Sequence, residues 1–178
     1  MKVIEKNNTK GKSSVVYCVQ ERRLLSSIDF PFIVKYETHL QTRSSLFLIM
    51  EYVEGTDLFR LLRANKRFTE NQVRFYVSQV LLSLEYLHQM KIIFRDIKLE
   101  NILIDRTGNV KMVDLGLARV LTKSEPCRSF CGTIHYLAPE IIAGKEYNEA
   151  VDWWSLGVLA YEVRKLYRKY LTLTTSLS

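Results

Sequence analysis

The segment Phe94–Asn101 constrains this chain more than any other, because it places an acid, a lysine and an asparagine on one short stretch. These residues are Asp96, Lys98 and Asn101. A second acid, Asp114, follows Asn101 after thirteen residues, and the sequence between them contains two short apolar runs around a polar turn. This pattern predicts a β-hairpin between the two acids. An acid, a cation and metal-binding side chains in this order suit phosphoryl transfer from a metal-bound nucleotide.

The composition indicates a globular domain with a substantial core. Of the 178 residues, 47% are hydrophobic and 25% are charged, which are ordinary values for globular proteins. No apolar run is long enough to span a bilayer, and the N-terminus lacks the apolar region of a signal peptide. We therefore expect no membrane span and a cytoplasmic location, with the nucleus as the alternative. The net charge of +7 is scattered along the chain, so we expect no nucleic-acid partner.

Local patterns predict both strands and helices. The apolar run 46–50 indicates a buried strand, and Gly55–Asp57 is expected to end the extended segment and cap a helix from Leu58. Thr69 and Gln72 match a capping box that opens a long amphipathic helix. This mixture predicts an α+β fold. The remaining predicted elements are helices at 13–27 and 150–163 and a hairpin at 102–113.

Several ordered segments together resemble the eukaryotic serine/threonine protein kinases, and within them the AGC group that includes the cAMP-dependent kinases. The resemblance runs from Met1 to about Val163 without a large gap. The segments that carry it, besides 94–101 and 114–116, are 50–53, 74–76, 85–88, 136–140 and 151–154.

The resemblance implies a two-lobed protein-kinase-like fold of class α+β. Residues 1–53 would form part of the small lobe and the hinge, and residues 54–163 part of the large lobe. We expect this partial kinase domain, 1–163, to lack the first strands with their glycine-rich phosphate cover and the last helices. Residues 164–178 form a divergent tail, basic at first and then rich in Ser and Thr.

The resemblance also implies roles for the first group of residues. Asp96 would orient the substrate hydroxyl as its oxygen attacks the γ-phosphate of ATP. Lys98 would stabilise charge that develops on the transferred group. Asn101 and Asp114 would hold Mg²⁺, which prefers oxygen ligands.

Further residues would bind the nucleotide. Lys2 would contact the α- and β-phosphates, with Glu21 as its helix partner. The hinge Glu51–Val53 would offer backbone groups of Glu51 and Val53 to adenine, and Met50 would lie at the back of the pocket. Taken alone, a terminal lysine or a helix glutamate is ordinarily a solvated charge, so the later motifs carry this assignment.

Another group would serve regulation. Ser129 matches the activation-loop phosphosite, with Arg95 and Arg119 placed to clamp the phosphate; the alternative is an exposed loop serine. Phe94 and Leu115 depart from the residue types usual at their positions, but both are large and apolar. Their packing with Leu25 and Tyr36 is therefore expected to survive.

Three acids, Asp57, Glu100 and Glu162, match those that bind arginines of the substrate, and exposed or structural carboxylates are the alternative. The implied partners are protein substrates with basic residues near the acceptor Ser or Thr, and a kinase regulatory subunit. The implied activity is that of a serine/threonine protein kinase using ATP and Mg²⁺, weakened by truncation. Two other hypotheses are an inactive, pseudokinase-like binding module and a fragment without a stable fold.

Overall fold

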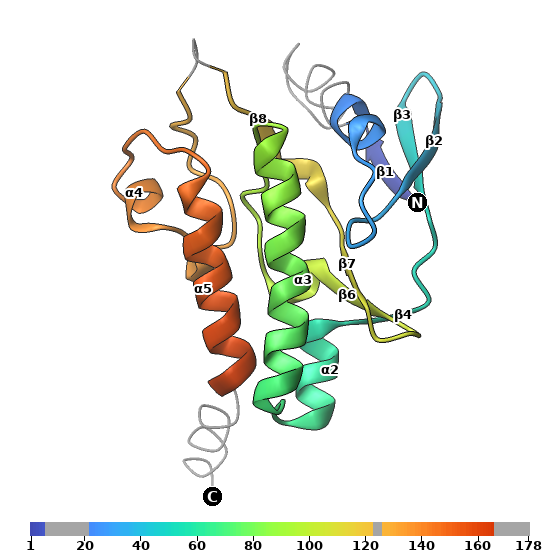
Figure 1. The fold of residues 1–178 in the computed structure, drawn as a ribbon. Helices are drawn as coiled ribbons and strands as arrows, with labels where there is room; N and C mark the ends of the chain where they lie inside the picture. Colours follow the sequence, from blue (N-terminus) through green and yellow to red (C-terminus); the bar gives the residue numbers. More distant parts are fainter. Residues whose placement is uncertain (6–21, 123–125, 166–178) are drawn as a thin grey trace, which may run out of the picture.

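The computed structural model describes residues 1–5, 22–122 and 126–165, which form two parts joined by the segment 51–54 (Figure 1). The first part holds an antiparallel sheet of three strands in the order β1-β3-β2, with the helical residues 22–27 beside it. Leu46 and Leu48 of the central strand are buried, which confirms the strand predicted from the apolar run. The strands are β1 (Lys2–Glu5), β2 (Tyr36–Gln41) and β3 (Ser45–Met50).

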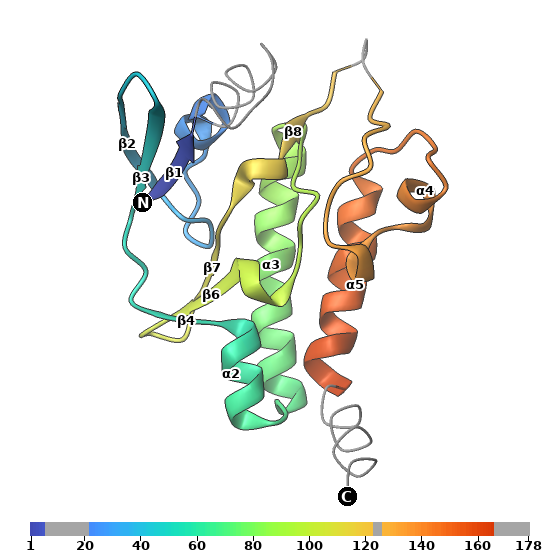
Figure 2. The same ribbon diagram turned by 180° about the vertical axis from the view of Figure 1, so that it is seen from behind.

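The second part is mainly helical, and α3 and α5 pack side by side in both views (Figures 1 and 2). Two small antiparallel sheets accompany them, one of order β4-β6-β7 and one that pairs β5 with β8. The helices are α2 (Leu58–Asn65), α3 (Glu70–Gln89), α4 (Pro139–Ile142) and α5 (Ala150–Lys165). The strands are β4 (Gly55–Asp57), β5 (Ile92–Ile93), β6 (Ile102–Asp105), β7 (Val110–Met112) and β8 (Arg119–Val120). Three short 3₁₀ helices are η1 (Leu99–Asn101), η2 (Leu115–Leu117) and η3 (Ile134–Tyr136).

The helix α3 begins where its capping box predicts. The Thr69 hydroxyl accepts a hydrogen bond from the Gln72 backbone N–H, and the Gln72 side chain accepts one from the Thr69 N–H. These bonds satisfy donors that the first helical turn leaves unpaired. The predicted apolar face is buried at Tyr76, Val80, Leu84 and Leu87, so α3 forms the central support of the second part.

The main core passes through the segment that carries the candidate site. Leu25, Phe94 and Leu115 belong to one buried cluster, and Tyr36 packs against it. This confirms the packing expected from the large apolar residues at the two atypical positions. The hairpin is also confirmed, because β6 and β7 pair antiparallel across their turn. The core therefore connects the helix at 22–27 with the loop of Asp96 and the turn of Asp114.

One sequence expectation needs correction. The segment Gly55–Asp57 does not simply end an extended stretch, because it forms β4 and pairs with β6; Asp57 still caps α2 as predicted. The helix predicted at 150–163 is confirmed as α5, which continues two residues further, to Lys165. The predicted helix at 13–27 is observed at 22–27, and its earlier residues lie outside the described ranges. Within the described ranges, no helix combines the length and apolar character needed to cross a bilayer.

Candidate active site

The loop that carries Asp96 is held in place by a residue of α5, Asp152. The carboxylate of Asp152 accepts hydrogen bonds from the backbone N–H groups of Phe94 and Arg95, each at 2.9 Å. It also contacts Nε2 of His88 at 2.8 Å. Asp152 is completely buried, and Arg95 has a φ of 68°. A left-handed conformation at a non-glycine residue persists only where its surroundings impose it, and Asp152 provides that constraint.

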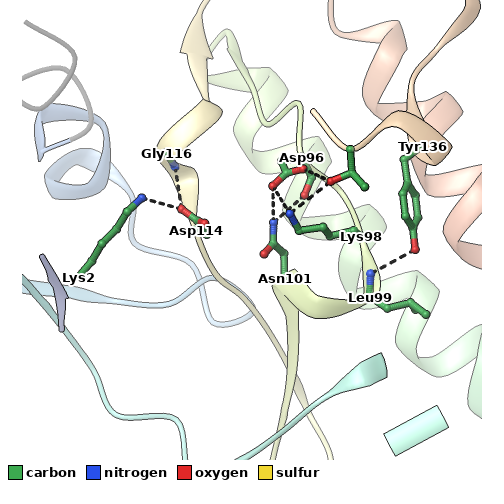
Figure 3. A network of polar contacts seen from close by, with 9 residues as sticks. Lys2, Asp96, Lys98, Leu99, Asn101, Asp114, Gly116 and Tyr136 are labelled. Carbon is green, nitrogen blue, oxygen red and sulfur yellow. Dashed lines mark hydrogen bonds and ion pairs between the residues drawn. The ribbon is translucent and has the colours of Figure 1, made fainter. Parts of the chain in front are cut away.

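The side chain of Asp96 lies at the centre of a compact polar group, in which Lys98 and Asn101 point toward it (Figure 3). Its Oδ2 accepts hydrogen bonds from Nζ of Lys98 at 2.7 Å and from Nδ2 of Asn101 at 2.9 Å. Its Oδ1 accepts one from the hydroxyl of Thr133 at 2.8 Å. The structure therefore brings together the acid, the lysine and the asparagine that the sequence placed on one loop.

Asn101 is oriented by two contacts with the same residue. Its Nδ2 donates to the backbone carbonyl of Asp96 at 2.8 Å as well as to the carboxylate. Because the amide nitrogen is occupied in this way, the side-chain oxygen of Asn101 remains as an acceptor for a cation.

The second acid, Asp114, lies on the turn before η2 and points toward the first part of the molecule. Nζ of Lys2 lies 2.7 Å from its Oδ1 (Figure 3), and the Gly116 backbone N–H donates to the same oxygen at 3.2 Å. Burial by itself would raise the pKa of Asp114. The contact with Lys2, the Gly116 bond and the charge of Lys98 outweigh burial and hold the pKa below its ordinary value. Asp114 is thus ionised at neutral pH.

The oxygen atoms of Asn101 and Asp114 suit a hard cation such as Mg²⁺. No three His, Cys, Asp or Glu side chains gather as a metal cluster among residues 1–5, 22–122 and 126–165. A cation held by these two side chains would thus take its remaining oxygens from phosphates and water, which is how Mg²⁺ is ordinarily bound.

The predicted nucleotide residues are only partly described. Lys2 is placed beside Asp114, whereas its predicted partner Glu21 lies outside the described residues. Met50 ends β3 and pairs with Tyr36 of β2. In the hinge, Glu51 and Val53 are partly buried while Tyr52 points into solvent.

Ser129 contacts one of its two predicted arginines. Nη1 of Arg95 donates to the Ser129 hydroxyl at 2.8 Å, and the same atom lies 3.1 Å from the hydroxyl of Tyr147. Tyr147 in turn donates to the Ser129 carbonyl at 2.9 Å. Arg119 lies on β8, where its backbone pairs with Ile93, two residues before Arg95.

The three candidate substrate acids differ in their present contacts. Asp57 caps α2 by accepting a hydrogen bond from the Arg60 N–H at 2.8 Å. This carboxylate therefore has a structural role, which was the alternative to binding a substrate arginine. Glu162 accepts the hydroxyl proton of Tyr136 in a hydrogen bond. Burial raises the pKa of Tyr136, and the charges of Glu162 and Glu100 raise it further. Of the two glutamates, Glu162 is the one that bonds to the Tyr136 hydroxyl.

Sequence reasoning did not assign roles to His88, Thr133 or Asp152. Thr133 could not be linked to Asp96 by spacing, because the two residues are far apart in the chain and meet only through folding. Asp152 did leave a signal, since it is the one carboxylate in the largely apolar first part of this helix, residues 150–161. A buried acid in such a position needs hydrogen-bond donors, and the loop amides supply them.

Comparison with known proteins identifies the family of the chain. The model of the protein kinase domain matches residues 1–172. The cAMP-dependent protein kinase catalytic subunit of Schizosaccharomyces pombe is 44% identical over 163 residues, which cover 92% of this chain and 32% of that protein. The cAMP-dependent protein kinase type 3 of Saccharomyces cerevisiae is 40% identical over 175 residues, covering 98% and 44%.

Another similar relative is a kinase of the RAC family. The RAC family serine/threonine-protein kinase homolog of Dictyostelium discoideum is 39% identical over 185 aligned positions, covering 96% of this chain and 42% of that protein. The chain thus spans between 32% and 44% of the length of these relatives. The family match over most of the chain, together with the grouping of Asp96, Lys98 and Asn101, shows that the chain belongs to the protein kinase family, alongside serine/threonine kinases of the AGC type.

Proposed function

We propose that this chain carries the phosphotransfer site of a serine/threonine protein kinase that uses ATP and Mg²⁺. The observation that carries the proposal is the environment of Asp96, whose carboxylate is buried yet bonded to Lys98, Asn101 and Thr133. A fixed carboxylate of this kind can orient an incoming hydroxyl and accept its proton. Lys98 then stabilises negative charge beside that carboxylate. A magnesium ion bound to Asn101 and Asp114 would neutralise phosphate charge.

The test is a phosphotransfer assay with ATP, Mg²⁺ and an arginine-containing serine peptide. Asp96→Asn and Asp114→Asn should each abolish the signal, because one removes the proton acceptor and the other a metal ligand. Asp105→Asn, at the partly exposed end of β6, is the matched control and should retain the phosphotransfer signal. Transfer that survives both active-site changes would mean that another site, or a contaminant, performs the reaction.

We further propose a preference for substrates with basic residues near the acceptor. Glu100 is exposed and Glu162 is partly buried beside Tyr136, so together they offer negative charge to a guanidinium group. Glu100→Gln and Glu162→Gln should weaken the use of an arginine peptide more than the use of its alanine counterpart. Glu70→Gln, on the exposed surface of α3, is the control. Equal losses with both peptides would contradict the preference.

Ser129 is the proposed phosphosite, because Arg95 already donates to its hydroxyl. A phosphate there would gain charge-assisted hydrogen bonds from the same guanidinium. Phosphopeptide mass spectrometry on active protein from its own cell should detect the modification. Active protein with unmodified Ser129 would contradict this assignment.

The regulatory subunit as partner and the cytoplasmic location also stay predictions, to be tested by co-purification and by imaging of the tagged protein.

A further inference from the structure

The side chain of Glu51, in the hinge, has contacts that are separate from any backbone role toward adenine. Its Oε1 accepts a hydrogen bond from Nζ of Lys111 at 2.7 Å and another from the Lys35 backbone N–H at 2.8 Å. The Glu51 N–H in turn donates to the Lys35 carbonyl at 2.9 Å. One carboxylate thus links three chain segments that are distant in sequence.

These contacts join the two parts of the molecule. Lys111 belongs to β7, the strand that leads into Asp114. Lys35 follows a segment bonded to the same strand, since Met112 donates to the Phe32 carbonyl at 2.7 Å and Val34 donates to the Met112 carbonyl at 2.9 Å. The ion pair between Glu51 and Lys111 therefore links the hinge directly to β7.

This ion pair is partly shielded from water. The side chains of Lys111 and Glu51 are 19% and 27% exposed. Burial by itself would raise the pKa of Glu51, but Lys111 and the Lys35 amide outweigh it and hold the pKa below its ordinary value of 4.5. The pair is therefore charged at neutral pH, and water screens it less than it screens a surface pair.

A second ion pair nearby offers a contrast. Nη1 of Arg106, in the β6–β7 turn, lies 3.0 Å from Oε1 of Glu54, and these side chains are 74% and 60% exposed. It also connects the segment 51–54 with the hairpin, but exposed pairs of this kind contribute little.

We propose that the Glu51–Lys111 ion pair positions the hinge for the adenine base, which makes Lys111 a positioning residue of the nucleotide site. The inference rests on the nucleotide use proposed above. The ion pair contributes to binding of the adenine base and not of the phosphates, because it fixes the hinge and lies apart from the Lys2–Asp114 contact. Breaking it should therefore weaken adenosine and ATP equally.

The experiment is calorimetric titration of the full chain with adenosine and with ATP–Mg²⁺. Lys111→Met and Glu51→Gln should each lower the affinity for both ligands by about 5- to 20-fold, the lower part of the usual range for coupled sites. Glu51→Gln retains an acceptor for the Lys35 amide and so removes mainly the charge. Lys111→Arg keeps the charge and should restore most of the affinity. Glu54→Gln and Arg106→Met are the matched controls and should bind within about twofold of the unchanged chain.

Each result decides the matter. Unchanged adenosine affinity in Lys111→Met and Glu51→Gln would overturn the inference and leave the proposed kinase function standing. A loss for ATP alone would overturn it too, because the effect would then lie at the phosphates. Lower binding stoichiometry at unchanged affinity would show that the pair only stabilises the fold. If the unchanged chain bound neither ligand, both the inference and the nucleotide use on which it rests would fail.

Discussion

The loop of Asp96 and the turn of Asp114 both contain one residue in the left-handed region, Arg95 at a φ of 68° and Asp114 itself at 64°. Their supports differ. The loop is anchored by the buried carboxylate of Asp152 and by contacts from within the second part of the molecule. Asp114 is about half exposed, and Lys2, which comes from the small sheet of the first part, bonds to its carboxylate.

This difference separates two ways of holding an acid at the proposed phosphotransfer site. The carboxylate of Asp96 is held by Lys98, Asn101 and Thr133, all within the second part, so its hydrogen bonds do not depend on how the two parts approach. Asp114 depends on a contact between the parts, and its exposed carboxylate can exchange Lys2 for a cation. The first acid is suited to a fixed role and the second to a partner that arrives with the substrate.

The largest effect is expected at the anchor of the loop. Asp152→Ala removes the acceptor for the Phe94 and Arg95 amides and for His88, leaving buried donors unpaired. We expect a loss of about 3–5 kcal/mol in the free energy of unfolding, a large share of the roughly 5–15 kcal/mol typical of a domain. Denaturant unfolding measures it.

The control for this change is Asp105→Ala. Asp105 also accepts three hydrogen bonds, from Thr107 and Asn109, but it is only partly buried, so water can take the place of its carboxylate. Asp105→Ala should lower the free energy of unfolding by about 1 kcal/mol. Similar losses for the two variants would show that burial of the anchor is not what distinguishes the loop.

An intermediate effect is expected at Thr133, whose hydroxyl donates to Asp96 and lies 3.3 Å from Nζ of Lys98. Thr133→Val keeps the shape but leaves one oxygen of Asp96 without its donor, which should cost about 1–2 kcal/mol in the free energy of unfolding. Phosphotransfer should fall with it. Thr133→Ser retains the hydroxyl and should restore both, and a serine variant as impaired as the valine variant would refute this role.

The features that could be predicted from the sequence are those that depend on residues close together in the chain. The capping box of Thr69 and Gln72, the face of α3 and the β6–β7 hairpin depend on neighbours within a few residues, so periodicity and turn chemistry sufficed. The grouping of Asp96, Lys98 and Asn101 was predicted because one short loop carries all three. The contributions of Thr133 and Asp152 were not, because each reaches the loop through tertiary packing, which a single sequence does not display.

The smallest effect is expected for the contact between the two parts. The side chains of Lys2 and Asp114 are 33% and 47% exposed, so Lys2→Met should lower the free energy of unfolding by less than about 1 kcal/mol. Lys145→Met, at an exposed lysine of the second part, is the control for removing a charge. A loss above about 2 kcal/mol would place Asp114 in the same class as the anchored loop and remove the contrast between the two acids.

The pH dependence of this small effect has a definite sign. The folded pKa of Asp114 lies below its ordinary value of 3.8, so the unfolded chain binds a proton there more readily than the folded one. The contribution of the ionised Asp114 to the free energy of unfolding is therefore fully present at a pH above the ordinary pKa. It is lost as the pH falls through the lower pKa of the folded chain. Without Mg²⁺, the stabilities of the unchanged chain and Lys2→Met should differ at pH 7 and converge as the pH falls below 3.8 and through the lower folded pKa of Asp114. A gap that persists at the acid end would mean that Lys2 stabilises the fold through packing and not through the charge of Asp114.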